Sequence, residues 1–319
     1  MTEENEERLA QLAEQYQIGK DNNSDEQIKL LGQLDTYPQD QLIQIVNFFI
    51  TREKNPNILL YLVKITGKYR DKSSTSVLID LLLLKDIYKE NIANPEEYLK
   101  VRCMAATILG NIKEQSAVVP LLYILNNKDE NYKLRLGAAE ALGRIGDKYA
   151  VAPLIEVVTN EDEKSVYIRE SAAKALGMLG DIRAVDPLIN LLDTKKGIID
   201  KFTFLKERII EAIGKLGFRD DKTIKVLSNT LMDESSCIRL EAIEALSEID
   251  DERVLPLIEK MIYDEEEDVA RGTIAALYNV AGEEYIINLL KRDDLPGWCK
   301  DEIETILEEE DDEDKDEEY

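Results

Sequence analysis

A block of ten residues recurs along the chain at intervals of about 34 residues, and this period constrains the fold more than any other feature. Clear copies are VRCMAATILG at 101–110, LRLGAAEALG at 134–143, IRESAAKALG at 168–177 and IRLEAIEALS at 238–247. Degenerate copies lie at 205–214 and 269–278, and fainter ones near 31–35 and 64–67. A second motif, AVVPLL, AVAPLI, AVDPLI or RVLPLI, follows four of the blocks. The chain therefore reads as an array of about eight units.

Each unit is predicted to form two helices. In the block at 168–179 the apolar residues fall at positions 168, 172, 173, 175, 176 and 179, the spacing of one helical face. Gly180 ends this helix, Asp181 or a neighbouring polar group is expected to cap the next one, and Pro187 lies in that helix's first turn. Neither helix can bury its apolar face alone, so stacked repeats must supply the core. The predicted fold is all-α, a right-handed α-solenoid of stacked antiparallel helix pairs.

The repeated pattern V-R-x-x-A-A-x-A-L-G-x-[IL]-G-D-x-x-A-V-x-P-L-I resembles the HEAT-like repeats of the phycobilisome bilin lyase family, over roughly 25–290. The resemblance implies a ladder between neighbouring repeats, made by an arginine of one helix and an aspartate of the turn. The arginines would be Arg102, Arg135, Arg169 and Arg239, and the aspartates Asp147, Asp181 and Asp250. The chain departs from the pattern at Lys206, Ala270 and Asn111, where the ladder is expected to be interrupted.

Composition excludes several classes of function. The chain has 66 acidic and 40 basic residues, a net charge of −26, which disfavours nucleic acid and anionic membrane surfaces as partners. It has no histidine, so Ser–His or Cys–His nucleophile pairs and His-ligated zinc are excluded. Three widely spaced cysteines indicate no metal site and fit a reducing cytoplasm. The acidic first residues predict no signal peptide. We therefore expect a cytoplasmic protein without a cofactor, more plausibly a non-enzyme than an enzyme.

Four segments are expected along the chain. Residues 1–24 would form an N-terminal capping helix and 25–290 the repeat array. Residues 291–307 would form a C-terminal capping helix. The tail at 308–319 holds ten acidic residues and one lysine, so it is predicted to be disordered.

By resemblance to HEAT arrays, the helix of the recurring block lines a concave face, and its non-core positions form rows across the repeats. We call the residues expected there the groove residues: Cys103, Thr107, Leu136, Glu140, Arg144, Glu170, Lys174, Met178, Glu211, Lys215, Leu240 and Glu244. Exposed apolar side chains among them would indicate a protein partner, although scattered apolar residues are also normal on a solvated surface. Cys103 is more simply a packing residue than a nucleophile, because no histidine is present to activate it.

A second candidate surface is a row of aromatic residues at the connections that precede the recurring block. These aromatic edge residues are Tyr88, Tyr98, Tyr132, Tyr167, Phe202 and Phe204. Tyrosine is enriched in protein interfaces, which favours binding. The alternative is that each ring packs back on the start of its own helix.

Two functions follow. The first is a non-enzymatic scaffold or adaptor that binds a protein client along the groove, for instance during assembly of a cofactor-bearing protein; a second HEAT-like subunit is another candidate partner. The second is implied by the resemblance alone: a bilin lyase-like factor that attaches or detaches a chromophore on a phycobiliprotein. Such an activity needs cations for the propionates, for which Arg144, Lys174 and Lys215 are candidates, with Glu140 and Glu211 as nearby acids. HEAT-like repeats are far more widespread than lyases, so the scaffold is preferred.

Overall fold

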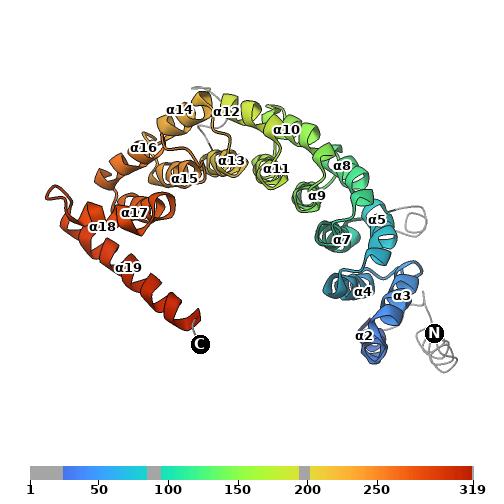
Figure 1. The fold of residues 1–319 in the computed structure, drawn as a ribbon. Coiled ribbons are helices and arrows are strands. Elements are labelled where there is room, and N and C mark those ends of the chain that lie inside the picture. The colour runs from blue at the N-terminus through green and yellow to red at the C-terminus, as the bar shows by residue number, and fades with distance from the viewer. Residues whose placement is uncertain (1–23, 85–94, 194–201, 318–319) are drawn as a thin grey trace. The chain divides into compact units, whose positions relative to one another are not determined.

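The computed structural model describes residues 24–84, 95–193 and 202–317, and these residues form helices without a β-strand among them (Figure 1). They belong to an all-α solenoid. The chain divides into two compact units, Met1–Pro153 and Leu154–Tyr319, which we call unit 1 and unit 2. The capping helix expected at 1–24 and the edge residue Tyr88 lie outside the described residues.

Unit 1 contains pairs of α-helices, most of them joined by a short 3-10 turn. Its elements are α2 (Ser24–Leu31), η1 (Gly32–Thr36), α3 (Gln39–Ile50), α4 (Pro56–Tyr69), η2 (Lys72–Ser74), α5 (Thr75–Leu83), η3 (Pro95–Tyr98), α7 (Leu99–Ile112), η4 (Gln115–Ala117), α8 (Val118–Asn126), α9 (Tyr132–Ile145), η5 (Lys148–Ala150) and the start of α10 (Val151–Thr159). Helices α4, α7 and α9 pack side by side in one layer. We call such helices, which carry the recurring block, first helices.

Unit 2 repeats this arrangement. Its elements are the end of α10, α11 (Val166–Leu179), η6 (Ile182–Ala184), α12 (Val185–Asp193), α13 (Thr203–Leu216), α14 (Asp221–Thr230), α15 (Ser236–Ser247), α16 (Leu255–Glu259), η8 (Lys260–Tyr263), α17 (Glu267–Ala281), α18 (Glu283–Leu290) and α19 (Gly297–Glu317). The first helices α11, α13, α15 and α17 pack in sequence, and α12 packs on α14 in the second layer.

The predicted signals act in α11 and the turn after it. The six apolar positions predicted to form one helical face, from Ile168 to Leu179, are all buried. Gly180 ends the helix with φ +61°, a left-handed conformation that glycine adopts at little cost. The Asp181 carboxylate then accepts a hydrogen bond from the Arg183 backbone N–H and caps η6.

Small residues let the first helices approach closely. A Cβ added to Gly214 of α13 would lie 2.7 Å from the Cα of Ala245 in α15, and one added to Gly177 would lie 3.0 Å from the Cα of Ala212. In unit 1 a Cβ at Gly110 would lie 2.8 Å from the Cα of Ala141. These glycines set the separation of the helices that carry the groove residues.

In four of the repeats a buried arginine contacts the turns beside it. The Nε of Arg102 donates to the Leu82 carbonyl at 2.8 Å, and its terminal nitrogens donate to both carboxylate oxygens of Glu130. Arg135 and Arg169 donate in the same way to the carbonyls of Leu125 and Val158, each at 2.8 Å.

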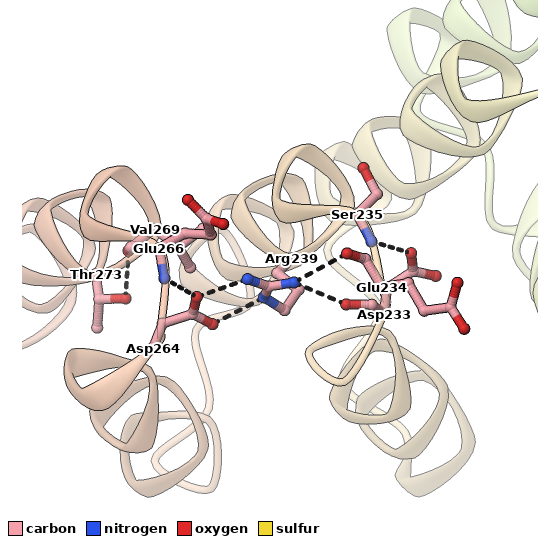
Figure 2. Close-up of polar contacts among 8 residues, drawn as sticks. All are labelled: Asp233, Glu234, Ser235, Arg239, Asp264, Glu266, Val269 and Thr273. Carbon is pink, nitrogen blue, oxygen red and sulfur yellow. Dashed lines mark hydrogen bonds and ion pairs between the residues drawn. The ribbon is translucent and has the colours of Figure 1, made fainter.

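Arg239 makes the fullest version of this contact (Figure 2). Its Nε and Nη2 donate to the two oxygens of Asp264, at 2.8 and 2.6 Å. Its Nη1 donates to the backbone carbonyls of Asp233 at 2.9 Å and Glu234 at 3.4 Å. Burial by itself raises the pKa of Asp264, but the hydrogen bonds from Arg239 and from the Glu266 backbone N–H, together with the charge of Arg239, outweigh it, and the pKa lies below its usual value.

Two expectations about this ladder were wrong: which acids pair with the arginines, and the interruption at Lys206. Arg102 and Arg239 pair with Glu130 and Asp264, acids of the connections between repeats, rather than with the turn aspartates. Asp147 instead caps η5 through the Tyr149 N–H. At Lys206 the ladder continues, because the lysine pairs with Asp233, an acid in the same position as Asp264.

Helix α19 closes unit 2. Its Cys299 and Ile303 are fully buried, and the Arg271 guanidinium of α17 lies 5.5 Å from the centre of the Trp298 ring. The helix begins at Gly297, within the expected cap, and continues to Glu317, through residues where the charge run predicts disorder. Glutamate is a strong helix former, and adding residues to an existing helix avoids the cost of nucleation.

The buried arginine contact can be tested at Arg239. Arg239→Met leaves Asp264 buried without its cation and should lower the free energy of unfolding by about 3–5 kcal/mol. The same change at the exposed Arg253, which pairs with Asp221 and Asp251, should cost far less, because solvent screens an exposed ion pair. Trp298, the single tryptophan, reports urea unfolding of unit 2 by its fluorescence. We call this buried arginine contact the clamp, and the carboxylate that pairs with it the clamp acid. Equal losses in the two variants would show that the clamp does not stabilise the fold.

The close helix approach can be tested at Gly214. Gly214→Ala should destabilise unit 2 by about 1–3 kcal/mol, because the new methyl group meets the Ala245 backbone rather than a movable side chain. Gly297→Ala adds the same methyl group where no atom lies within 4 Å, and should leave the urea midpoint unchanged or higher. A Gly214→Ala midpoint equal to wild type would show that the helices can separate freely.

Candidate functional site

The groove residues of unit 1 lie on α7 and α9 and are all half-buried. Glu140 and Arg144 occupy adjacent turns of α9 and form an ion pair at 3.2 Å. On α7 the Thr107 hydroxyl donates to the Cys103 carbonyl, 3.1 Å away. Burial raises the pKa of the Cys103 thiol above its usual value, against the opposing effect of Arg102. Cys103 is therefore kept as a thiol, which disfavours it as a nucleophile.

In unit 2 the groove residues come from three successive first helices. Lys174 and Met178 on α11 are exposed, as are Lys215 on α13 and Glu244 on α15. The remaining three, Glu170, Glu211 and Leu240, are half-buried. The Leu240 side chain lies against Gly272 of α17, where a Cβ would overlap its Cδ1. Leu240 is thus a packing residue between helices.

A hollow of about 270 Å³ lies between α13 and α15. Its lining residues are Arg208, Glu211, Lys215, Glu241, Glu244, Ala245 and Glu248. The close approach of Gly214 to Ala245 forms its base, and the Glu248 carboxylate lies 3.0 Å from the position of a Cβ on Gly214. The hollow contains three of the groove residues together with neighbours that the sequence pattern did not select.

The hollow carries more negative charge than its cations neutralise. Both cations, Arg208 and Lys215, pair with the same carboxylate, Glu211. Glu241, Glu244 and Glu248 form no ion pair with another described residue. Four carboxylates beside two cations leave an excess of negative charge, which favours a further bound cation.

Burial and the neighbouring negative charges raise the pKa values of two glutamates in the hollow. Burial, followed by the negative charge of Glu244, raises the pKa of Glu241 to about 7. Burial likewise raises the pKa of Glu248, with Lys215 opposing it and Glu211 and Glu244 adding to it. Glu241 is therefore half protonated near neutral pH, and a bound cation would release its proton.

The sequence pattern missed Arg208 and Glu241 as members of this site. Both occupy the fourth position of the recurring block, which is Met104, Gly137, Ser171 and Gly272 in other repeats. That position faces the neighbouring first helix, as Gly272 does against Leu240. A charged residue at a register otherwise held by uncharged residues is the signal that could have located the hollow.

The aromatic edge residues differ in how exposed their side chains are. Tyr98 is buried, and its hydroxyl donates to the Lys54 carbonyl in the connection before α4, so it packs within unit 1. Tyr132 in unit 1, and Tyr167, Phe202 and Phe204 in unit 2, are exposed. Phe204, at 71%, is the most exposed of them.

The family follows from these repeats. A model of HEAT repeats matches residues 91–166, 120–201 and 200–278, which together cover more than half of the chain. The chain therefore belongs to the HEAT repeat family.

Solved structures of other helical proteins are similar to the chain. The complex of CpcE and CpcF of phycocyanin lyase from Nostoc sp. matches with 23% identity and a TM-score of 0.47, over 72% of this chain and 94% of that one. YibA of E. coli matches with 18% identity and a TM-score of 0.47, over 89% and 99% of the two chains. Human deoxyhypusine hydroxylase matches with 16% identity and a TM-score of 0.34, over 86% and 96%. The comparison with curated proteins gave no match.

Among the described residues, no helix is both long enough and apolar enough to cross a membrane. The same residues contain no cluster of three or more cysteine or carboxylate side chains arranged to hold a metal ion.

The protonation of Glu241 gives a prediction about stability. An ordinary glutamate titrates near pH 4.3, so the folded state holds this proton more tightly than the unfolded state and loses stability as pH rises from about 4.5 to 7. Because Glu241 is half-buried, we expect Glu241→Gln to stabilise unit 2 by about 1–2 kcal/mol at pH 8 and by almost nothing at pH 4.

Urea unfolding followed by Trp298 fluorescence at the two pH values measures this difference. Glu252→Gln changes an exposed turn residue of the same unit and should leave the difference between the two pH values as in wild type. A Glu241→Gln gain of the same size at pH 4 and pH 8 would contradict the assignment.

Proposed function

We propose that the protein is a non-enzymatic HEAT-repeat scaffold that binds a protein client along its first helices, and that the client presents a basic segment to the hollow of unit 2. The observation that carries the proposal is the group of three carboxylates, Glu241, Glu244 and Glu248, that share one hollow without a cation of their own.

The arrangement suits a lysine or arginine side chain. Glu244 and Glu248 are exposed and lie one helical turn apart, so an incoming cation can reach both. Glu241 is half-buried beside them, where a charge-assisted hydrogen bond is stronger than in open solvent. The exposed Met178 lies on α11, the first helix that packs on the other side of α13, and offers apolar contact beyond the hollow.

A bilin lyase-like function gains less support from these residues. Two of the cations that would hold the propionates are already paired, Arg144 with Glu140 and Lys215 with Glu211. Lys174 is the third candidate and lies exposed on α11. The acidic excess of the hollow repels propionates, which favours the scaffold.

The test compares two triple variants of the full chain in an affinity pull-down from native cytoplasm. Glu241→Gln, Glu244→Gln and Glu248→Gln together should reduce recovery of the dominant stoichiometric client at least about tenfold, since each lost charge pair contributes to affinity. The control changes Glu252, Glu283 and Glu284 to Gln, three exposed glutamates outside the hollow, and should recover the client fully.

The affinity for that client should also depend on pH. Binding a cation lowers the pKa of Glu241, so the complex forms with release of a proton and Kd should fall as pH rises from 6 to 8. Equal recovery by both triple variants, or a Kd that rises over this range, would contradict the proposal. A coloured eluate with absorbance of a bilin would favour the lyase-like function instead.

A further inference from the structure

A second surface lies at the turns between the repeats of unit 2, and none of its lining residues belongs to the hollow. It consists of two neighbouring cavities on either side of Met232, whose side chain is 83% exposed. One cavity, of about 380 Å³, is lined by residues around Lys206, Asp233 and Ile238. The other, of about 370 Å³, is lined by residues around Arg239, Tyr263 and Asp264.

The same local pattern creates the exposed side chain in two successive turns. Leu231 and Ile262 are buried, the following Met232 and Tyr263 are exposed, and the next residues are the clamp acids Asp233 and Asp264. In the turn that ends at the clamp acid Glu130 of unit 1, the preceding residue is the charged Asp129. An exposed large apolar residue at this register is therefore a property of the last two turns rather than of the repeat.

The turn that carries Met232 is held in place before any partner arrives. Backbone hydrogen bonds join Met232 to Asn229 and Asp233 to Thr230, at 3.2 and 3.1 Å. The Asp233 carboxylate pairs with Lys206, and the Asp233 carbonyl accepts from Arg239 (Figure 2). A turn fixed in this way loses little conformational entropy when it binds, so the exposed methionine can contribute to affinity.

Tyr263 is fixed in a similar way. Its hydroxyl donates to Asp294 at 2.6 Å and accepts from Arg292 at 3.1 Å, while half of the side chain stays exposed. The two apolar side chains thus stand as rigid elements at the cavity between them.

The charge around the cavities indicates the chemistry of a partner. Lys206 and Arg239 are neutralised by Asp233 and Asp264. Glu234 and Glu265 are exposed on the rims, without an ion pair to another described residue, and Lys260 is the opposing cation. The exposed Glu266 and Glu267 follow directly, so the rim is acidic around an apolar centre.

We propose that this edge of unit 2 binds an extended segment of a partner protein that carries one large apolar side chain, for the cavity lined by Met232 and Tyr263, flanked by lysine or arginine. The apolar side chain packs against Met232 and Tyr263, and the flanking cations pair with Glu265 and, in the more polar cavity beside Met232, with Glu234. The surface is independent of the proposed function, because it shares no residue with the carboxylate hollow.

The test selects binders from a phage-displayed library of random twelve-residue peptides against the immobilised full chain. The enriched peptides should share one large apolar residue and at least one lysine or arginine beside it. A fluorescein-labelled copy of the most enriched peptide then gives Kd by anisotropy. Met232→Asp should raise this Kd at least about tenfold. Charge reversal by Glu234→Lys together with Glu265→Lys should also raise this Kd at least about tenfold. If Met232→Asp alters the circular dichroism spectrum, the charge-reversal variant serves as the test instead.

Two control variants separate this surface from others in unit 2. Ile182→Asp places the same charge on another exposed apolar residue, in η6, and should leave Kd unchanged. The triple Gln variant of Glu241, Glu244 and Glu248 should also leave it unchanged, so the two proposals fail separately. Absence of enrichment, an acidic consensus or an unchanged Kd in Met232→Asp would overturn the inference. A self-association in sedimentation that Met232→Asp abolishes would overturn it in favour of a second copy of the chain.

Discussion

The structure depends on a buried arginine at the second position of the recurring block. A helix pair of this length cannot bury its apolar face alone, so its stability lies in the contacts with adjoining turns. Arg239 supplies three such contacts at once, to two backbone carbonyls behind it and to the Asp264 carboxylate ahead of it. The arginine is expensive to bury, and these acceptors offset that cost. Where a lysine replaces it at Lys206, one acid partner is kept, Asp233.

The clamp and the glycine contacts together decide where function can lie. Gly214 brings α13 and α15 so close that side chains on their facing registers must share space, and in this repeat those side chains are charged. The clamp fixes the turns at the ends of the same helices, and in these turns the side chains of Met232 and Tyr263 are exposed rather than packed in the core. Both candidate surfaces of unit 2 are therefore consequences of how its repeats are joined.

Features set by a few neighbouring residues could be predicted from the sequence. The apolar face of α11, its end at Gly180 and the cap at Asp181 each depend on spacing within one repeat. The clamp acids could not be predicted in this way, because Glu130 and Asp264 lie 28 and 25 residues beyond their arginines. Glu241 was missed for a related reason: its neighbours Arg208 and Glu211 come from another repeat, and only helix packing brings the three together.

The contrast between Asp264 and Glu241 separates two roles for carboxylates in an acidic chain. Asp264 lies in a buried contact yet stays ionised, because Arg239 satisfies both of its oxygens. Glu241 is half-buried among other acids, has no cation of its own, and holds its proton up to about pH 7. The Asp264 carboxylate is fully paired and stabilises the fold. The Glu241 carboxylate forms no ion pair with a described residue, so a cation from a partner would stabilise its ionised form. The carboxylates that the fold leaves without a cation are thus the ones available to a basic partner.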